Sequence, residues 1–173
     1  LSFYSFASTA PFEFQQAATK ILATTGYKGI ILDLRNNPGG FLEVAVDIAG
    51  WFLNAGDLVA IEQFGKEENS NKTEFRASGL GGLKNYPVVV LVNQGTASAA
   101  EILAGALRDN RGAKLVGEKT FGKGSVQELI NLAGGSSLKV TVAKWLTPKG
   151  ISISEHGLEP DYKVTITEED TAK

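Results

Sequence analysis

Apolar residues follow two patterns along this chain: short, nearly continuous runs, and longer stretches with helical spacing. The runs are typical of buried strands and the spaced stretches of helices. Strands are expected over residues 29–34, 58–64, 87–93, 113–118, 125–130 and 138–147. Helices are expected over residues 12–24, 41–53 and 99–110, and the polar residues 65–71 are expected to form an exposed loop or hairpin tip. Strands separated by helices indicate an α/β fold with a buried, largely parallel sheet.

The composition is that of an ordinary globular domain and narrows the classes of partner. The chain has 173 residues, of which 43% are hydrophobic and 21% charged, so residues 1–173 are expected to form one domain. Its net charge of -2, without a run of Lys and Arg, argues against a nucleic-acid partner. No apolar run reaches the roughly 20 residues that cross a bilayer. There are no cysteines and a single histidine, His156, which leaves little from which to build a zinc site.

Two glycine-rich turns follow apolar strands and precede helices. They are NNPGG at residues 36–40 and QGTASAAE at residues 94–101. Open α/β sheets place their sites at the carboxyl ends of strands, in turns of this kind. Glycines in the first turn either make a tight bend or let backbone N–H groups approach a ligand.

Ser98 lies where the second turn meets the following helix, among small residues. It can be a helix cap, which accepts a hydrogen bond from the first helical turn. It can also be a nucleophile at the positive end of a helix, with the N–H of Ala99 ready to bind an oxyanion. The sequence pattern at this position leaves both interpretations open.

A nucleophilic serine needs a base, and lysine is the strongest candidate type in this chain. His156 lies in a polar stretch and is expected to be an exposed loop residue, while Asp33, in an apolar strand, needs a partner if it is buried. A lysine amine can accept a proton once burial has lowered its pKa. Lys123 lies between two glycines, and Gln127 is close enough to hold its amine without adding a charge. Serine–lysine pairs are a known variant of the serine triad.

The stretch around Lys123 also comes within one residue of a phosphate-binding loop. Gly117, Gly122 and Lys123 fit the pattern G-x-x-x-x-G-K-[ST], but Gly124 replaces the hydroxyl that holds Mg²⁺. A strand is expected after it, where a phosphate loop leads into a helix. We therefore expect no nucleotide and no other cofactor at this loop.

Three blocks of the sequence resemble the protease core of the C-terminal processing, or tail-specific, peptidases. They are LDLRNNPGG at residues 32–40, VVLVNQGTASAAEILAGAL at residues 89–107 and GEKTFGKGSVQ at residues 117–127. KVTVAKWLTPKGISI and GLEPD are similar to the closing strands of that family. The resemblance covers most of the chain in order and implies a fold like that of the Clp protease and crotonase, a spiral of β-β-α units.

The resemblance also implies a role for individual residues. Ser98 is then the nucleophile, Lys123 the general base and Gln127 the residue that orients the lysine. The N–H groups of Ala99 and Gly40, with Gly40 chosen over Gly39, form the oxyanion hole. One departure from the family is Ala100, which replaces a supporting serine in the common TASASE motif.

The function implied is that of a serine endopeptidase that cleaves proteins near a free C-terminus through an acyl-enzyme. The alternatives are an inactive core that only binds peptides and a crotonase-like acyl-CoA enzyme. Family members usually carry a PDZ domain that grips the substrate tail, and no such stretch is visible here. The chain begins at Leu1, without an initiator or signal peptide, and is expected to be part of a longer protein. The resemblance also implies an extracytoplasmic location, in the periplasm or cell envelope, and leaves homo-oligomers open.

Overall fold

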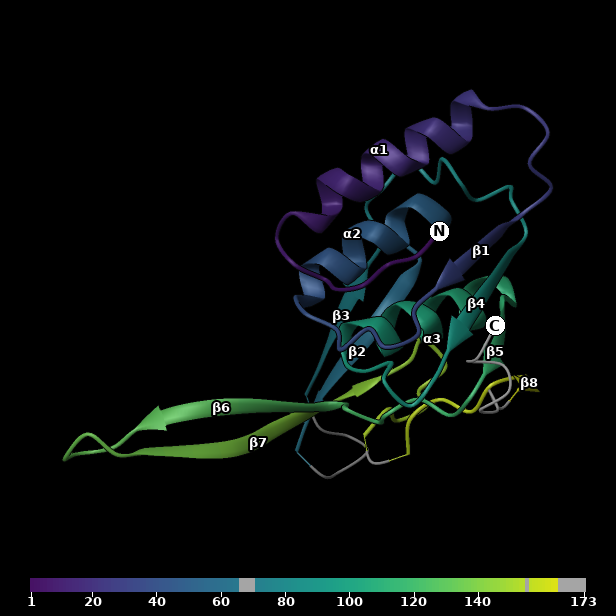
Figure 1. Ribbon diagram of the computed structural model, residues 1–173. Coiled ribbons are helices and arrows are strands. Elements are labelled where there is room, and N and C mark those ends of the chain that lie inside the picture. The colour runs from purple at the N-terminus through teal and green to yellow at the C-terminus, as the bar shows by residue number, and fades with distance from the viewer. Residues whose placement is uncertain (66–70, 155, 165–173) are drawn as a thin grey trace, which may run out of the picture.

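The computed structural model describes residues 1–65, 71–154 and 156–164, which form two β-sheets and three helices (Figure 1). The first sheet is parallel, in the order β1 (Ile30–Asp33), β4 (Val88–Val92), β5 (Lys114–Gly117) and β8 (Tyr162–Lys163). The second is antiparallel, in the order β3 (Lys72–Arg76), β2 (Leu58–Phe64), β7 (Ser137–Leu146) and β6 (Ser125–Asn131). The helices are α1 (Ala10–Ala23), α2 (Leu42–Phe52) and α3 (Ala99–Arg111).

The expected elements are confirmed to within two residues at each end, and so is the α/β class. The expected parallel sheet is present, but half of the strands belong to a separate antiparallel sheet that was not predicted. Strand β3 was not predicted, since its KTEFR sequence has no apolar run and pairs only as an exposed edge. Of the expected loop at residues 65–71, positions 66–70 lie outside the described residues.

Helix α3 occupies the centre of the fold. It packs against α2, against β2 of the antiparallel sheet and against β5 of the parallel sheet. Its sequence is rich in alanine, and every residue from Ala99 to Leu107 is buried. Small side chains let neighbouring elements approach the helix closely, so the position of its first turn is set by packing on several sides.

Helices α1 and α2 cover the rest of the core. Phe14 of α1 contacts the rings of Trp51 and Phe52 of α2, with ring centroids 6.2 and 5.7 Å apart. Such apolar and aromatic contacts stabilise the helix pair through burial and ring geometry. Within the described ranges, no helix has the length and apolarity that a membrane crossing demands.

The parallel sheet brings two turns to the same edge. β1 and β4 are neighbours in register, with Asp33 opposite Leu91, so both strands end on the same side. The β1–α2 turn and the β4–α3 turn both leave from that side. This is the place where open α/β sheets position their functional residues.

Candidate active site

Hydrogen bonds join the two turns at the carboxyl edge of the parallel sheet. The buried Thr96 hydroxyl donates to the Leu34 carbonyl at 2.8 Å, and the Ala97 N–H donates to the Asn37 carbonyl at 2.9 Å. Asn93 and Asn36 form a second link, in which the Asn93 amide donates to Asn36 Oδ1 at 2.9 Å. The first turn is thereby held against the residues that precede α3.

Gly39 provides the closest approach between the turns. A Cβ atom at Gly39 would lie 2.6 Å from the Ala97 carbonyl oxygen, 2.7 Å from Ser98 Cβ and 2.9 Å from the Ala99 nitrogen. Gly39 also has a φ of 94°, a conformation that side chains rarely adopt. Only glycine fits this position, because the backbone of the PGG turn lies directly against Ser98.

Ser98 has an unusual backbone conformation. It is the residue before α3, with φ 56° and ψ -121°, and it is one of two non-glycine residues with positive φ among the described residues. Strained conformations of this kind cost about 1–3 kcal/mol and concentrate at functional sites. A sharp strand-to-helix turn at a serine is also how nucleophile elbows expose their hydroxyl group.

The buried carboxylate of Glu101 connects Ser98 to the segment that carries Lys123. Oε2 of Glu101 accepts hydrogen bonds from the Ser98 and Lys123 backbone N–H groups, each at 2.9 Å. Oε1 accepts from the Gly122 N–H at 2.8 Å and from the Thr120 hydroxyl. Glu101 is fully buried, and these four donors replace the water that an ionised carboxylate would otherwise need.

Glu101 was not among the residues predicted for the site. The signal was present, because Ser98 and Glu101 have the S-x-x-E spacing of a capping box, in which the glutamate reaches back to the first residue of the box. The second half of its role could not be read from local sequence, because the Gly122 and Lys123 N–H groups arrive from 21 and 22 residues away.

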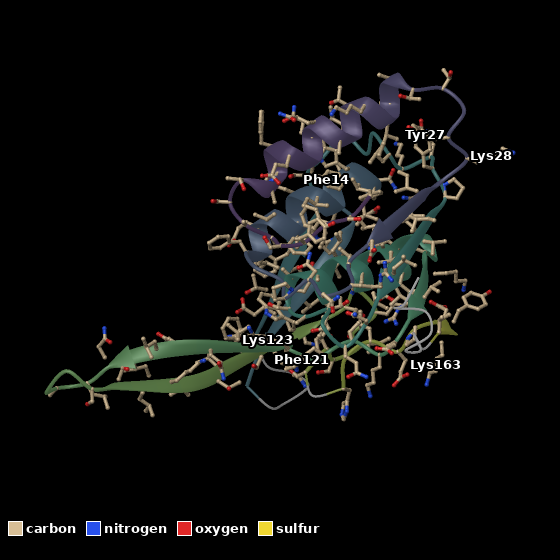
Figure 2. The ribbon with its side chains drawn as sticks, viewed as in Figure 1. Phe14, Tyr27, Lys28, Phe121, Lys123 and Lys163 are labelled. Carbon is tan, nitrogen blue, oxygen red and sulfur yellow. The ribbon has the colours of Figure 1, made fainter. Side chains whose placement is uncertain are left out.

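The main chain of Lys123 is thus close to Ser98, but its side chain is exposed. The backbone nitrogens of Ser98 and Lys123 each lie 2.9 Å from Glu101 Oε2, so the distance between the two nitrogens cannot exceed the sum of these two hydrogen bonds. Figure 2 shows Lys123 and Phe121 where the β6–β7 hairpin joins the body of the protein. In the described part of the chain, no hydrogen bond links the Lys123 amine to the Ser98 hydroxyl.

Gln127 lies on β6, and its side chain is exposed. Its amide lies 3.5 Å from the Thr141 hydroxyl of β7, which is a long contact for a hydrogen bond. Over residues 1–65, 71–154 and 156–164, Gln127 forms no hydrogen bond with Lys123. The structure therefore brings the main chains of Ser98 and Lys123 together, but among the described residues no hydrogen bond links the three predicted side chains.

Among the described residues, the backbone N–H groups predicted to form the oxyanion hole have no hydrogen-bond partner. Ala99 is the first residue of α3, and neither its N–H nor that of Gly40 has a hydrogen-bond partner within the described ranges. The Gly39 N–H, by contrast, donates to Asn37 Oδ1 at 2.9 Å. This difference favours Gly40 over Gly39 as the second donor.

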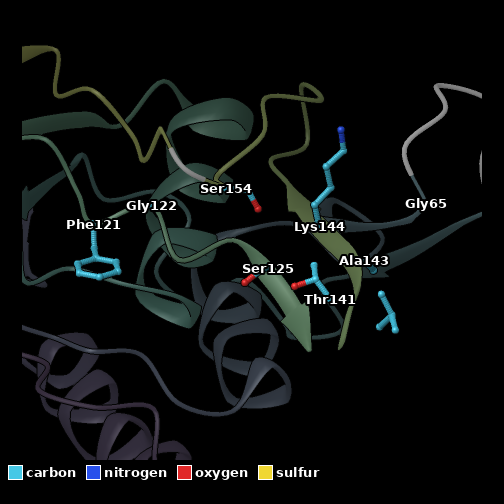
Figure 3. Close-up of a pocket in the computed structure, with 9 residues that line it drawn as sticks. Gly65, Phe121, Gly122, Ser125, Thr141, Ala143, Lys144 and Ser154 are labelled. Carbon is cyan, nitrogen blue, oxygen red and sulfur yellow. The ribbon is translucent and has the colours of Figure 1, made fainter. Parts of the chain in front are cut away.

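A cavity of about 640 Å³ opens beside Gly122, at the base of the β6–β7 hairpin. Figure 3 shows Ser125, Thr141, Ala143 and Lys144 on the two strands that line it, with Ser154 on the neighbouring loop. The wall combines apolar surface with hydroxyl groups. Its size is that of pockets that bury ligands larger than a single side chain.

The other titratable candidates are not part of this cluster. Asp33 is paired with Arg35 at 2.7 Å, and the Arg35 hydrogen bond lowers the pKa of the Asp33 carboxyl below its ordinary 3.8. His156 is exposed on a loop, as predicted. Among the residues that the structure describes, no group of three His, Cys, Asp or Glu side chains could hold a metal ion.

Comparison with known proteins places these features in one family. The model of peptidase family S41 matches residues 1–164. A carboxyl-terminal-processing protease of Synechocystis sp. is 50% identical over 144 residues, which cover 83% of this chain and 32% of the relative. The chloroplastic C-terminal processing peptidase of Tetradesmus obliquus is 42% identical over 150 residues, 87% of this chain and 31% of the relative. The chain thus spans about a third of the length of these relatives.

Solved structures confirm the expected architecture. The photosystem II D1 C-terminal processing protease matches with a TM-score of 0.85 and 36% identity, over 95% of this chain and 41% of that one. Mature CPAF matches with a TM-score of 0.75 over 94% of this chain and 46% of that one, and at 14% identity it shows the fold alone. The fold is the Clp protease-like arrangement that the sequence predicted.

Proposed function

This chain belongs to peptidase family S41, and on that premise we propose that it is the protease core of a serine endopeptidase that uses Ser98 and Lys123. The observation that carries the proposal is the shared carboxylate of Glu101. It accepts hydrogen bonds from the backbone of a strained serine and from the backbone of the segment that carries the lysine, and so holds the two together. If Glu101 only capped the helix, the hydrogen bond from the Ser98 N–H would be enough, and the one from the Lys123 N–H would not be needed.

The proposed reaction proceeds through an acyl-enzyme. The Ser98 oxygen attacks the substrate carbonyl carbon while its proton passes to the neutral amine of Lys123. The carbonyl oxygen becomes an oxyanion and accepts hydrogen bonds from the Ala99 and Gly40 N–H groups. Lys123 then returns the proton to the leaving amine as the peptide bond breaks. Water then attacks the Ser98 ester while Lys123 accepts its proton, and Lys123 returns that proton to the Ser98 oxygen as the ester bond breaks.

The Lys123 side chain must move to act as this base, because it is exposed and, among the described residues, its amine forms no hydrogen bond with Ser98. Its main chain is already fixed by Glu101, so rotation of side-chain bonds is the change required. Catalytic hydrogen bonds often form fully only in the complex with substrate. In its new position, the Lys123 amine is then held and oriented by Gln127, which lies four residues further on in β6.

The substrate class rests on the relatives. Three of them are named as C-terminal processing enzymes, and the name of one of these also gives the photosystem II D1 protein. For this chain, we infer protein substrates that are cut near a free C-terminus, in an extracytoplasmic compartment such as the periplasm, cell envelope or plastid lumen. A PDZ domain elsewhere in the protein and assembly into a homo-oligomer complete this proposal.

A second function, a peptide-binding core without catalysis, is favoured by one observation. That observation is the missing contact between the Lys123 amine and the Ser98 hydroxyl in the described part of the chain. The two functions differ in their chemistry, so turnover separates them.

The test is degradation of an unfolded protein such as casein by the wild type, Ser98→Ala, Lys123→Ala and the double variant. If both residues serve one proton transfer, each single change removes nearly all turnover and the double variant is little worse. Wild-type turnover that survives either single change would exclude the pair. Binding of casein without cleavage by the wild type would support the peptide-binding core instead.

A further inference from the structure

The four outer strand edges of the two sheets differ in how well they are protected. Open edges present unpaired N–H and C=O groups that can pair with another chain, and proteins normally cover, shorten or charge them. β1 is covered by the first residues of the chain, since Phe3 N donates to Asp33 O at 3.0 Å and Asp33 N to Leu1 O at 2.9 Å. β8 is only two residues long.

Strands β3 and β6 are the two edges of the antiparallel sheet, and they contrast sharply. Three of the five β3 residues are charged: Lys72, Glu74 and Arg76. β6 is seven residues long, with the sequence SVQELIN, and Glu128 is its only charged residue. It contains no lysine and no proline, and among the described strands it pairs with β7 alone. Within the described residues, β6 is therefore the one long edge that nothing protects.

Among the described residues, no third strand pairs with the outer part of this hairpin. β2 pairs with β7 only from Ala143 to Leu146, whereas β6 pairs with β7 out to Ser137. Figure 1 shows β6 and β7 projecting from the body as a two-stranded arm. Two-stranded ribbons are marginally stable in water, and an added strand stabilises them.

The arm carries apolar side chains that an added strand could cover. Ile130 and Leu138 are directly opposite each other and point to one face, where they are 41% and 50% exposed. Leu129 points to the other face and is 62% exposed. Backbone pairing with β6 would therefore be reinforced by apolar contacts on both faces.

The β6 edge leads directly to the candidate active site. Its first residue, Ser125, follows Lys123 by two positions and lines the cavity beside Gly122. A bulge between Val126 and Gln127 interrupts the pairing with β7 at this point, as often happens next to active sites. The corresponding edge of β7 leads elsewhere, because Val142 O accepts a hydrogen bond from Gly65 N at the end of β2.

We propose that the exposed edge of β6 binds an unfolded stretch of substrate polypeptide as an additional β-strand and guides it to Ser98. The inference rests on the proposed peptidase function and adds to it how the enzyme recognises its substrate. Backbone pairing reads extended conformation more than sequence, so the preferred partner is an unstructured segment with alternating apolar side chains. Seven residues of strand span roughly 23 Å, which sets the number of substrate residues held on one side of the scissile bond at about seven.

The test measures binding by the Ser98→Ala variant, which does not depend on turnover. Fluorescent apolar peptides of ten residues are compared with versions N-methylated at one position each, using anisotropy. Alternate residues of a bound strand direct their N–H to the partner, so methylation should weaken binding about three- to tenfold at every second position and little in between. In amide hydrogen exchange of the same complex, bound peptide should protect amides of β6 and not those of β3. β3 is the control, because it is the other edge of the same sheet.

Several results would overturn the proposal. Absence of peptide binding, binding without the two-residue alternation, or protection at β3 would each do so. Protection of β6 without peptide, rising with protein concentration, would show that a second copy of the chain occupies the edge. Labelling of Ser98 in the wild type by a small fluorophosphonate does not require β6. If that labelling succeeds while the peptide test fails, the docking proposal fails alone; if labelling fails, the peptidase function fails.

Discussion

The backbone N–H groups of Ser98 and Lys123, 25 positions apart in the sequence, donate to the same Glu101 oxygen, each at 2.9 Å. One buried carboxylate thus sets the distance between the residue proposed to attack the substrate and the residue proposed to activate it. The same carboxylate accepts two further hydrogen bonds, from Gly122 and Thr120. It is therefore the point at which stability and activity should be lost together.

Replacing Glu101 by Gln should impair both properties. The amide of Gln has one acceptor oxygen, so its NH₂ group would face two of the four donors. Leaving buried donors unpaired at this site should lower the free energy of unfolding by about 3 kcal/mol. Urea denaturation measures this loss, and casein turnover should fall at least about a hundredfold, since small displacements of catalytic groups are costly. Glu13→Gln, at an exposed position of α1, is the matched control and should change neither quantity noticeably.

The close approach of the PGG turn to Ser98 predicts a specific effect of Gly39→Ala. Gly39 and Gly26 have nearly the same φ, 94° and 97°, but a Cβ at Gly26 meets nothing within 4 Å. Both alanine variants therefore carry similar backbone strain, and only Gly39→Ala pushes against Ser98. We expect Gly39→Ala to unfold about 1–3 kcal/mol more easily than Gly26→Ala and to lose most activity. Equal stability and equal activity of the two variants would show that the turn does not support Ser98.

The Asp33–Arg35 pair predicts how stability depends on pH. Arg35 lowers the pKa of Asp33 in the folded protein below 3.8, so the pair stabilises the fold above that pH. The stabilisation should disappear as the pH falls through the lowered pKa. Arg35→Gln should therefore be less stable than the wild type at pH 6, by about 0.5 kcal/mol because the pair is partly exposed, and the gap should close towards pH 2. A gap that stays constant across this range would mean that the pair is not its cause.

Lys123→Arg tests whether the lysine acts through its charge or through proton transfer. Arginine keeps a positive charge and reaches a similar distance, but its guanidinium stays protonated at any working pH. We expect Lys123→Arg to be as inactive as Lys123→Ala in casein turnover. Substantial activity of the arginine variant would reduce Lys123 to an electrostatic role.

The strands and helices of the core follow from local sequence, because burial dictates their apolar patterns. The run at residues 87–93 is almost wholly apolar, and it forms the central strand β4. β3 was not predicted because its pattern is set by exposure at a sheet edge, where charged residues are common. The division into two sheets depends on pairing between distant segments, which local periodicity does not encode.

The candidate site shows the same limit. Ser98 and the PGG turn could be found from strand–turn–helix patterns, and Lys123 from its place between glycines. The meeting of Ser98 and Lys123 at Glu101 depends on how residues 120–123 cross the start of α3. The exposure of the Lys123 amine does not follow from local pattern, since nothing in the sequence around Lys123 specifies which rotamer its surroundings leave free.

The measurement that tests the central claim most directly is covalent labelling by a fluorophosphonate, with the modified residue identified by peptide mass spectrometry. The wild type should carry one label, on Ser98, and the rate of labelling should fall to background in both Lys123→Ala and Lys123→Arg. Label on another serine, or labelling of Ser98 at an unchanged rate without Lys123, would contradict the proposal that these two residues form one catalytic unit.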